Sequence, residues 1–331
     1  MKKKRLFLSV AIFILGFILS GCDLLVFDPK GPQAQKIMDL INWSIIWISV
    51  VVIVVVALFV YVVWKYRAKP ENADYEPPEE EGSKLLETVW TIIPIMIVIL
   101  LTIPTMKTLF ELEQFPEGYQ DQEPLTIHVT SADWKWIFSY PEQNIETVNY
   151  VILPVNTPVN FKLTSAGTMQ SFWIPSLGGQ EYTMANMETE LPLVAEVTGE
   201  FVGRNTNFNG EGYASMEFKV LVQSQEEFDE WVKDIQERAP KLTEEEYVKL
   251  LQPSVLGQQL SFSNTHLEFI NHADHNSGSS NYIDPNKYLK DNEYPGRIFN
   301  NQDSGNQAEH KDHDSHGHDS HEEDGGGHSG H

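Results

Sequence analysis

The sequence contains one cysteine, Cys22, among its 331 residues. A single thiol excludes a disulfide within the chain and excludes a metal centre that needs two thiolates. Basic residues are also scarce, because 23 lysines and arginines stand against 47 aspartates and glutamates. Nucleic-acid-binding surfaces need a basic patch, so we expect no nucleic-acid partner. Long hydrophobic runs are absent after Phe110, and this divides the chain into an apolar and a polar part.

The first apolar run has the layout of a secretory signal. Basic residues Lys2–Arg5 precede the apolar stretch Leu6–Leu19, and small residues then lead to Cys22. The end of this run resembles the lipobox of bacterial lipoproteins. The resemblance implies a signal peptide over 1–21, cleavage before Cys22 and lipidation of its thiol. An uncleaved signal anchor with an incidental cysteine is the alternative interpretation.

Two further runs predict transmembrane helices. Ile45–Val63 carries no charge and Val89–Met106 carries none either. Each is about long enough to cross the roughly 30 Å hydrocarbon core as a helix. We therefore expect a transmembrane hairpin with spans at 38–64 and 86–108, and a lipid-anchored outer segment at 22–37.

The orientation of this hairpin follows from its charges. Lys65, Arg67 and Lys69 follow the first span at once, and positive residues favour the cytoplasmic side. The loop 65–85 is therefore predicted to be cytoplasmic. Both outer ends, including Cys22, are then extracytoplasmic, so the two topology signals agree.

The region 123–223 predicts an all-β sandwich. Short runs rich in β-branched and aromatic residues alternate with turn signals, which is typical of such a domain. The expected strands are Leu125–Thr130, Trp134–Tyr140, Val148–Leu153, Val159–Thr164, Ser171–Ile174, Leu191–Val197 and Met216–Val222.

A short helical arm is predicted over 224–270. Ser224–Glu227 has the form of a capping box before a helical apolar pattern, and Thr243–Glu246 begins a second short helix. The remaining residues, 271–331, are polar and low in complexity, and we expect them to be disordered.

Histidines gather in this tail among acidic residues. Imidazole binds zinc, copper and nickel, but the irregular spacing indicates weak binding and no defined metal site. One alternative is a solvated acidic tail without a metal-binding role. The other is a tail that captures copper and delivers it to an enzyme. The histidines are His310, His313, His316, His318, His321, His328 and His331.

Four separated motifs carry a family resemblance. They are Leu86–Pro94, Trp134–Phe138, Gln170–Gly178 and Phe201–Met216, in this order. The stretch 39–256 resembles subunit II of cytochrome c oxidases and bacterial heme-copper quinol oxidases. The resemblance implies a transmembrane hairpin followed by a cupredoxin-like Greek-key sandwich, with Trp134 packed against subunit I.

The chain departs from this family at the binuclear copper site, CuA. Copper-carrying members supply cysteine, glutamate, histidine and methionine ligands there, and amides are poor substitutes for soft copper. Within the family, loss of CuA marks the quinol oxidases. The asparagines could instead form a new site, although local hydrogen bonds to the loop backbone are the plainer interpretation. The matching positions are Gln170, Asn205, Asn207, Asn209, Tyr213 and Met216.

Glu87 is the candidate proton-handling residue. It lies at the expected cytoplasmic start of the second span, where an ionisable group indicates function. In the family, the glutamate of this motif marks the mouth of a proton channel that runs into subunit I. The alternatives are an interfacial glutamate that reaches water, or a pair with Lys84.

The resemblance thus implies subunit II of a proton-pumping quinol:oxygen oxidoreductase in the bacterial cytoplasmic membrane. This chain would hold no cofactor, because heme and CuB are expected in subunit I. The other expected partners are subunits III and IV, the lipid bilayer and membrane quinol as substrate. A metal-handling membrane lipoprotein is the alternative function. A cytochrome c oxidase subunit is excluded by the missing copper ligands.

Overall fold

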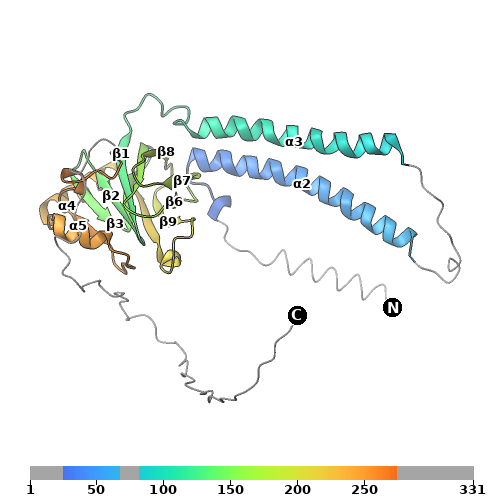
Figure 1. Ribbon diagram of the computed structural model, residues 1–331. Helices are drawn as coiled ribbons and strands as arrows, with labels where there is room; N and C mark the ends of the chain where they lie inside the picture. The colour runs from blue at the N-terminus through green and yellow to red at the C-terminus, as the bar shows by residue number, and fades with distance from the viewer. Residues whose placement is uncertain (1–24, 68–81, 274–331) are drawn as a thin grey trace, which may run out of the picture. The chain divides into compact units, whose positions relative to one another are not determined.

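The computed structural model describes residues 25–67 and 82–273. Within this part, a short 3-10 helix, η1 (Leu25–Phe27), precedes two long helices, and a β sandwich with short helices follows them (Figure 1). The predicted helical hairpin and β sandwich are therefore confirmed. Cys22, most of the loop between the long helices and the histidine-rich tail lie outside the described residues.

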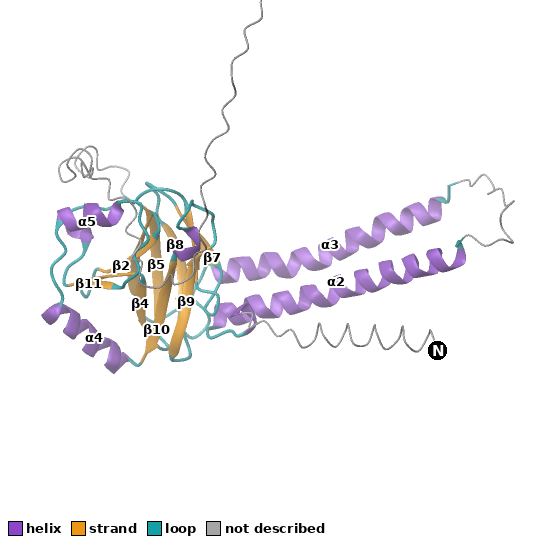
Figure 2. Ribbon diagram, turned by 90° about the horizontal axis from the view of Figure 1, so that it is seen from below, coloured by secondary structure: helices purple, strands orange, loops and turns teal. Residues whose placement is uncertain are grey.

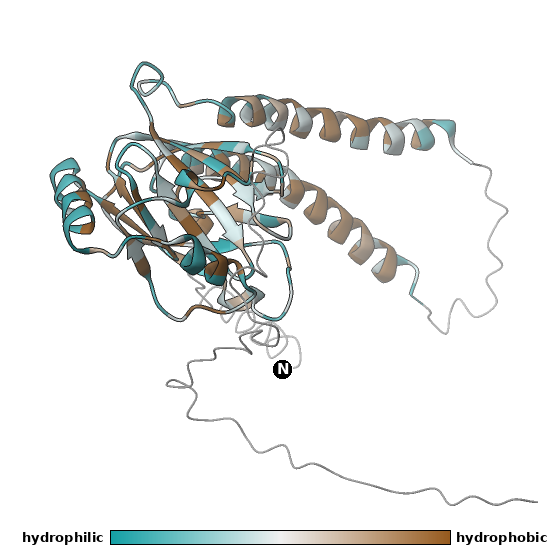
Figure 3. Cartoon of the chain, turned by 60° about the vertical axis from the view of Figure 1, so that its left-hand side comes forward, coloured by the Kyte–Doolittle hydropathy of each residue, from teal (hydrophilic) through white to brown (hydrophobic). Residues whose placement is uncertain are grey.

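The two long helices are α2 (Pro32–Lys65) and α3 (Lys84–Leu112). Both are long and apolar enough to cross a membrane, and Figure 3 shows apolar residues along most of their length. Their side chains are largely exposed to the surroundings, which is stable in lipid and costly in water. The chain is thus a membrane protein. The predicted spans 38–64 and 86–108 fall inside these helices, and the membrane boundaries stay a prediction.

An ion pair joins the two helices near one end. Lys36 Nζ of α2 lies 2.7 Å from Glu111 Oε2 of α3, and Lys107 lies 3.7 Å from the other oxygen of Glu111. The start of α2 and the end of α3 are therefore neighbours, which makes the helices antiparallel. Figures 1 and 2 both show them side by side.

The described strands form two sheets. The six-stranded sheet has the order β11-β3-β2-β1-β5-β8, and the five-stranded sheet has the order β4-β10-β9-β6-β7. The first sheet contains β1 (Leu125–Ala132), β2 (Lys135–Tyr140), β3 (Ile145–Val148), β5 (Pro158–Ser165), β8 (Thr189–Val194) and β11 (Leu260–Phe262). The second contains β4 (Tyr150–Pro154), β6 (Gln170–Trp173), β7 (Gln180–Thr183), β9 (Gly199–Asn205) and β10 (Glu217–Gln223).

The strand pairing brings several loops to one end of the sandwich. β1 and β5 are parallel, with Leu125 opposite Val159 and Ser131 opposite Ser165. The turns that follow them, 133–134 and 166–169, therefore lie at the same end. The segment 206–216 joins them there, because Thr206 N donates to Ser171 O near the start of β6.

Aromatic side chains fill the space between the sheets. Phe172 and Phe218 stack with ring centroids 5.1 Å apart, and Trp136 and Phe138 pack edge-on against them. All four rings are at most 3% exposed. Their burial supplies a large part of the hydrophobic stabilisation of the domain.

Strand β2 is buried on both faces because the C-terminal arm covers its outer side. Trp136 and Phe138 face the main core, whereas Ile137 packs in a second apolar cluster with Tyr247 and Phe262 of the arm. The arm contains α4 (Gln225–Arg238), α5 (Glu244–Leu251) and a short 3-10 helix, η4 (His266–Glu268), with α4 and α5 beside the strands in Figure 2. The capping box predicted at Ser224 is present, and the helix predicted to begin at Thr243 also starts with a capping box.

Two sequence expectations within the sandwich were wrong in detail. Val148–Leu153 was expected as one strand, but Asn149 has a φ of 62° and the chain changes sheet there, from β3 to β4. A left-handed residue interrupts a strand, and asparagine tolerates that conformation well. No strand was expected over Phe201–Asn205, but these residues form most of β9, which pairs with β10.

Candidate functional site

The six positions matched to the copper ligands all lie at one end of the sandwich. Gln170 begins β6, Asn205 ends β9, and Met216 directly precedes β10. Asn205 N donates to Met216 O over 3.1 Å, which closes the loop between these two strands. Asn207 and Asn209 lie inside that loop, and Tyr213 begins its short 3-10 helix, η3 (Tyr213–Ser215).

The sulfur of Met216 lies beneath two amide groups. The Nδ2 atoms of Asn205 and Asn209 lie 3.6 and 3.5 Å from Met216 Sδ. The methionine is 1% exposed and Asn205 is 3% exposed. The thioether is therefore engaged as a weak hydrogen-bond acceptor in the interior of the domain.

Asn205 uses its oxygen to hold the loop backbone. Its Oδ1 accepts from Ser171 N and from Asn207 N, each over 3.0 Å. Asn207 Nδ2 in turn donates to Met169 O over 2.8 Å. These bonds satisfy backbone groups that a buried loop would otherwise leave unpaired.

Gln170 is directed to a different partner. Its Nε2 donates to Asp133 Oδ1 over 2.9 Å, and Thr168 Oγ1 donates to the same oxygen over 2.7 Å. The Gln170 side chain is fully buried. Tyr213 is directed elsewhere again, since its ring packs against the exposed ring of Phe208 at 5.6 Å.

Trp134 is the residue whose local role the sequence interpretation missed. Its ring lies against Gly210 and Gly212 of the loop between β9 and β10, and its expected contact with subunit I stays a prediction. Its Nε1 donates to Asn209 O over 3.0 Å. A Cβ atom at position 212 would lie 2.2 Å from Trp134 Cδ2, so the close contact requires glycine. Spacing along the sequence gives no signal for this contact, because Trp134 and the two glycines lie far apart in the chain.

The donor atoms of this site do not fit a binuclear copper centre. Such a centre needs bridging thiolates and imidazoles, whereas the positions hold amides, a phenol and one thioether. The thioether already accepts from two amide groups. Elsewhere in the described part of the chain, no group of three or more His, Cys, Asp or Glu residues is arranged to hold a metal.

The other predicted functional residues lie apart from this site. Glu87 lies in the first turns of α3, where its N–H donates to Ser83 O over 3.0 Å and its carbonyl accepts from Thr91 Oγ1. Its side chain is exposed in the isolated chain. Two predicted sites lie outside the described residues: the lipidation site Cys22, and the tail histidines His310, His313, His316, His318 and His321.

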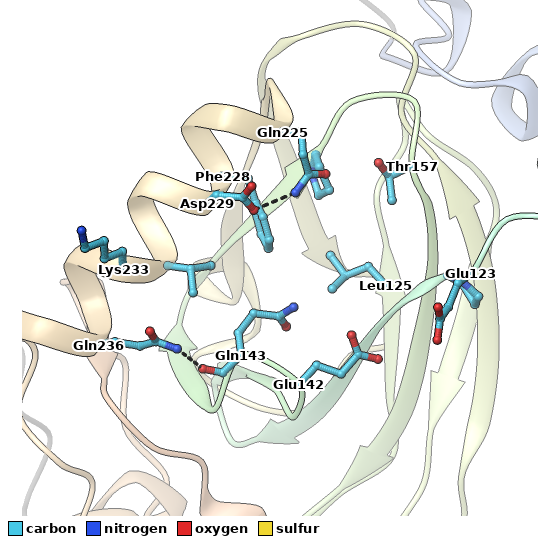
Figure 4. Close-up of a pocket in the computed structure, with 13 residues that line it drawn as sticks. Glu123, Leu125, Glu142, Gln143, Thr157, Gln225, Phe228, Asp229, Lys233 and Gln236 are labelled. Carbon is cyan, nitrogen blue, oxygen red and sulfur yellow. Dashed lines mark hydrogen bonds between the residues drawn. The ribbon is translucent and has the colours of Figure 1, made fainter.

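A pocket of about 400 Å³ lies at the opposite end of the sandwich, beside α4 (Figure 4). Leu125 at the start of β1 and Phe228 of α4 contribute apolar lining. Gln225 donates to Asp229, and Gln236 donates to the carbonyl of Gln143 across the rim. Two hydrogen bonds thus tie lining residues together, and the pocket is separate from the amide-lined loops.

Comparisons with known proteins match most of the chain. The family described as "Cytochrome C oxidase subunit II, transmembrane domain" matches residues 21–108. "Quinol oxidase subunit 2" of Bacillus cereus is 45% identical over 293 residues, which is 87% of this chain and 99% of that protein. The protein of the same name from Bacillus subtilis is 47% identical over 268 residues, which is 80% of this chain and 83% of that protein.

A solved structure is also similar in part. The periplasmic domain of subunit II of cytochrome oxidase from Bradyrhizobium japonicum has 26% sequence identity and a TM-score of 0.32. The similarity covers 33% of this chain and 91% of that domain. The identity to the two Bacillus proteins over nearly their whole length decides the assignment: this chain belongs to the quinol oxidase subunit 2 family.

Proposed function

We propose that this chain is subunit II of a quinol:oxygen oxidoreductase, a terminal oxidase of aerobic respiration. The observation that carries the proposal is the identity of 45–47% to quinol oxidase subunit 2 over most of the chain. The heme groups and CuB of such an oxidase would lie on subunit I. This chain would stabilise subunit I, together with subunits III and IV, in a complex that pumps protons.

The chemistry of the loop end supports quinol as the electron donor. Cytochrome c docks on the outer surface and needs a metal acceptor close by. The amides at the loop end, and the one thioether that already accepts from two of them, do not provide a site for such a metal. Quinol dissolves in the membrane and can reach the partner subunit directly. A quinol oxidase therefore needs no redox centre in this domain, and the loop is free to become a structural element.

The membrane topology is part of the proposal. Lys65 and Arg67 at the end of α2 favour a cytoplasmic turn between the helices. The sandwich and its arm would then lie on the extracytoplasmic face. Cleavage before Cys22 and lipidation of its thiol would anchor the mature N-terminus on that same face, which agrees with the position of η1 ahead of α2.

Glu87 is proposed to mark the cytoplasmic mouth of a proton channel into subunit I. Its place in the first turns of α3 puts a carboxylate at the membrane boundary predicted for the second span. The exposed side chain in the isolated chain is available to a partner helix.

The test is to purify the chain with its natural partners and to measure oxygen consumption with quinol and with reduced cytochrome c in parallel. We expect activity with quinol alone, with heme absorption and without the absorption of CuA. Activity with cytochrome c would contradict the assignment of the donor. A heme-free preparation would contradict the whole proposal and favour a metal-handling lipoprotein instead.

A further inference from the structure

The methionines of the β domain gather at one end of the sandwich. After Met106, the sequence contains four methionines, which are Met169, Met184, Met187 and Met216. Met169 directly precedes β6, Met184 directly follows β7, and Met187 lies just before β8. Met216 directly precedes β10. All four therefore lie at the end that carries the turn 166–169 and the loop 206–216.

The pairing of β6 with β7 turns two of these side chains to the outer face of the sheet. β7 is the edge strand of the five-stranded sheet, and Gln170 of β6 lies opposite Thr183 of β7 (Figure 1). Both of these side chains are fully buried. Successive side chains along a strand point to opposite faces, so Met169 and Met184 point outward. One further step in the same register sets them opposite each other, where Cβ atoms lie about 4.5–5.5 Å apart.

A tight turn brings the third thioether to the same place. Met184 and Met187 are the first and last residues of a β-turn, in which Asn186 has a φ of 58°. The first and last Cα atoms of such a turn lie within about 7 Å of each other. Met169 and Met187 are 46% and 43% exposed, and Met184 is half-buried. Because methionine side chains are unbranched and flexible, these three, which we call the methionine cluster, can converge on one ion.

The groups around the methionine cluster leave sulfur as the available donor. Glu188 follows the turn, but its Oε1 accepts from Lys162 Nζ over 3.0 Å. Met216 is 1% exposed, and its sulfur accepts from two amide groups of the loop. Tyr182 points to the same outer face as Met184 and is 41% exposed. The cluster therefore offers three thioethers beside an aromatic ring.

We propose that the methionine cluster binds one Cu(I) ion. Soft thioether ligands select Cu(I), whereas magnesium and calcium prefer oxygen ligands. The three thioethers are neutral, so the bound ion keeps its positive charge. The face of the Tyr182 ring attracts such a cation, and so does a chain with a formal net charge of −24. The site is separate from the buried loop positions matched to CuA, and it does not depend on which electron donor the oxidase uses.

The test is a titration of the purified full chain with Cu(I) in the absence of oxygen, followed by NMR of carbon-13-labelled methionine methyl groups. We expect the signals of Met169, Met184 and Met187 to shift together and to stop shifting at one ion per chain. The signals of Met96 and Met106 in α3 are the internal reference and should not move. The histidine-rich tail contains no methionine, so copper held there leaves these signals unchanged.

Two results of this titration would overturn the proposal. One is the absence of a saturating shift in the cluster, as expected for exposed methionines that only contact another protein. The other is a shift confined to Met216, which would place the copper in the loop between β9 and β10.

Leucine substitutions assign the ligands, because leucine nearly keeps the volume of methionine but has no sulfur. Met187→Leu should raise the Kd read from the two remaining cluster signals at least about tenfold, since loss of even an outer-shell partner typically costs that much in metal affinity. Met106→Leu is the matched control and should leave the Kd unchanged. An unchanged Kd in Met187→Leu would contradict its role as a ligand. The titration of the unsubstituted protein decides the proposal even where a variant fails to fold.

Discussion

At the residue scale, Trp134 fixes the shape of the loop between β9 and β10. Its indole donates to Asn209 O, and its ring lies flat against the backbone at Gly210 and Gly212. Gly210 also has a φ of 110°, which a residue with a side chain rarely adopts. The loop thus keeps a specific shape, although it contains no cysteine or histidine.

Gly212→Ala should displace the Trp134 ring, since the new Cβ would lie 2.2 Å from Cδ2. We expect a loss of about 1–3 kcal/mol in the free energy of unfolding, as is usual for overpacking. Denaturant unfolding followed by tryptophan fluorescence measures it. Gly257→Ala is the control, because nothing lies within 4 Å of a Cβ at that position. Equal unfolding curves for the two variants would show that the contact does not matter.

The identity of the loop residues could be read from the sequence, but their bonding could not. The motif order placed Gln170, Asn205 and Met216 together. Asn207 and Asn209, however, lie two residues apart and donate to different partners, Met169 O and Met216 Sδ. That choice depends on loop torsions set by distant contacts, so residue spacing alone does not predict it. That these positions bind no metal stays a prediction.

At the element scale, the start of α2 is fastened to the sandwich. Lys30 N donates to Ser176 O over 2.7 Å, and Ala34 N donates to Leu177 O over 3.1 Å. Gln33 Nε2 adds a bond of 3.2 Å to Pro192 O of β8. Backbone groups at this helix start, which lack partners within the helix, are thus satisfied by the β domain.

Gly31→Ala should break this junction. The new Cβ would lie 2.1 Å from the carbonyl oxygen of Val194, a backbone atom that cannot move aside cheaply. We expect the amides of Lys30 and Ala34 to exchange their hydrogens at least about tenfold faster, because a loss of 1.4 kcal/mol corresponds to that factor. Gly179→Ala is the local control, since its Cβ would meet only Ile37 Cδ1 at 3.8 Å. Unchanged exchange in Gly31→Ala would contradict a tight junction.

Elements with a strong local signal could be predicted, and those fixed by tertiary contacts could not. The capping boxes at Ser224 and Thr243 mark both arm helices correctly because each box satisfies helix N–H groups within four residues. The edge strands β7 and β11 are short, and they are strands only because they pair with β6 and β3. The break at Asn149 depends on its bonds to Trp136 at the end of the β2–β3 pair away from the turn.

At the scale of the whole molecule, basic residues are unevenly placed along the hairpin. Lys65, Arg67, Lys69 and Lys84 lie at or near its turn, whereas Lys36 and Lys107 lie toward its other end, and the chain as a whole has a formal net charge of −24. This asymmetry favours one orientation in the membrane. Glu87 is an acidic residue in the first turns of a helix that is long enough to span the bilayer.

In the proposed topology, an acidic residue at that position would suit proton uptake, because it would take protons from the cytoplasm and pass them to a partner subunit. Glu87→Gln in the assembled oxidase should slow turnover about tenfold, less than a fully buried proton donor would, since water can partly replace a group at a channel mouth. Heme content and subunit composition should stay unchanged, and Glu87→Asp should restore much of the rate. Lys84→Gln separates the alternatives: a structural pair between Lys84 and Glu87 requires both substitutions to act alike, whereas a proton-handling carboxylate requires only Glu87→Gln to slow oxygen consumption.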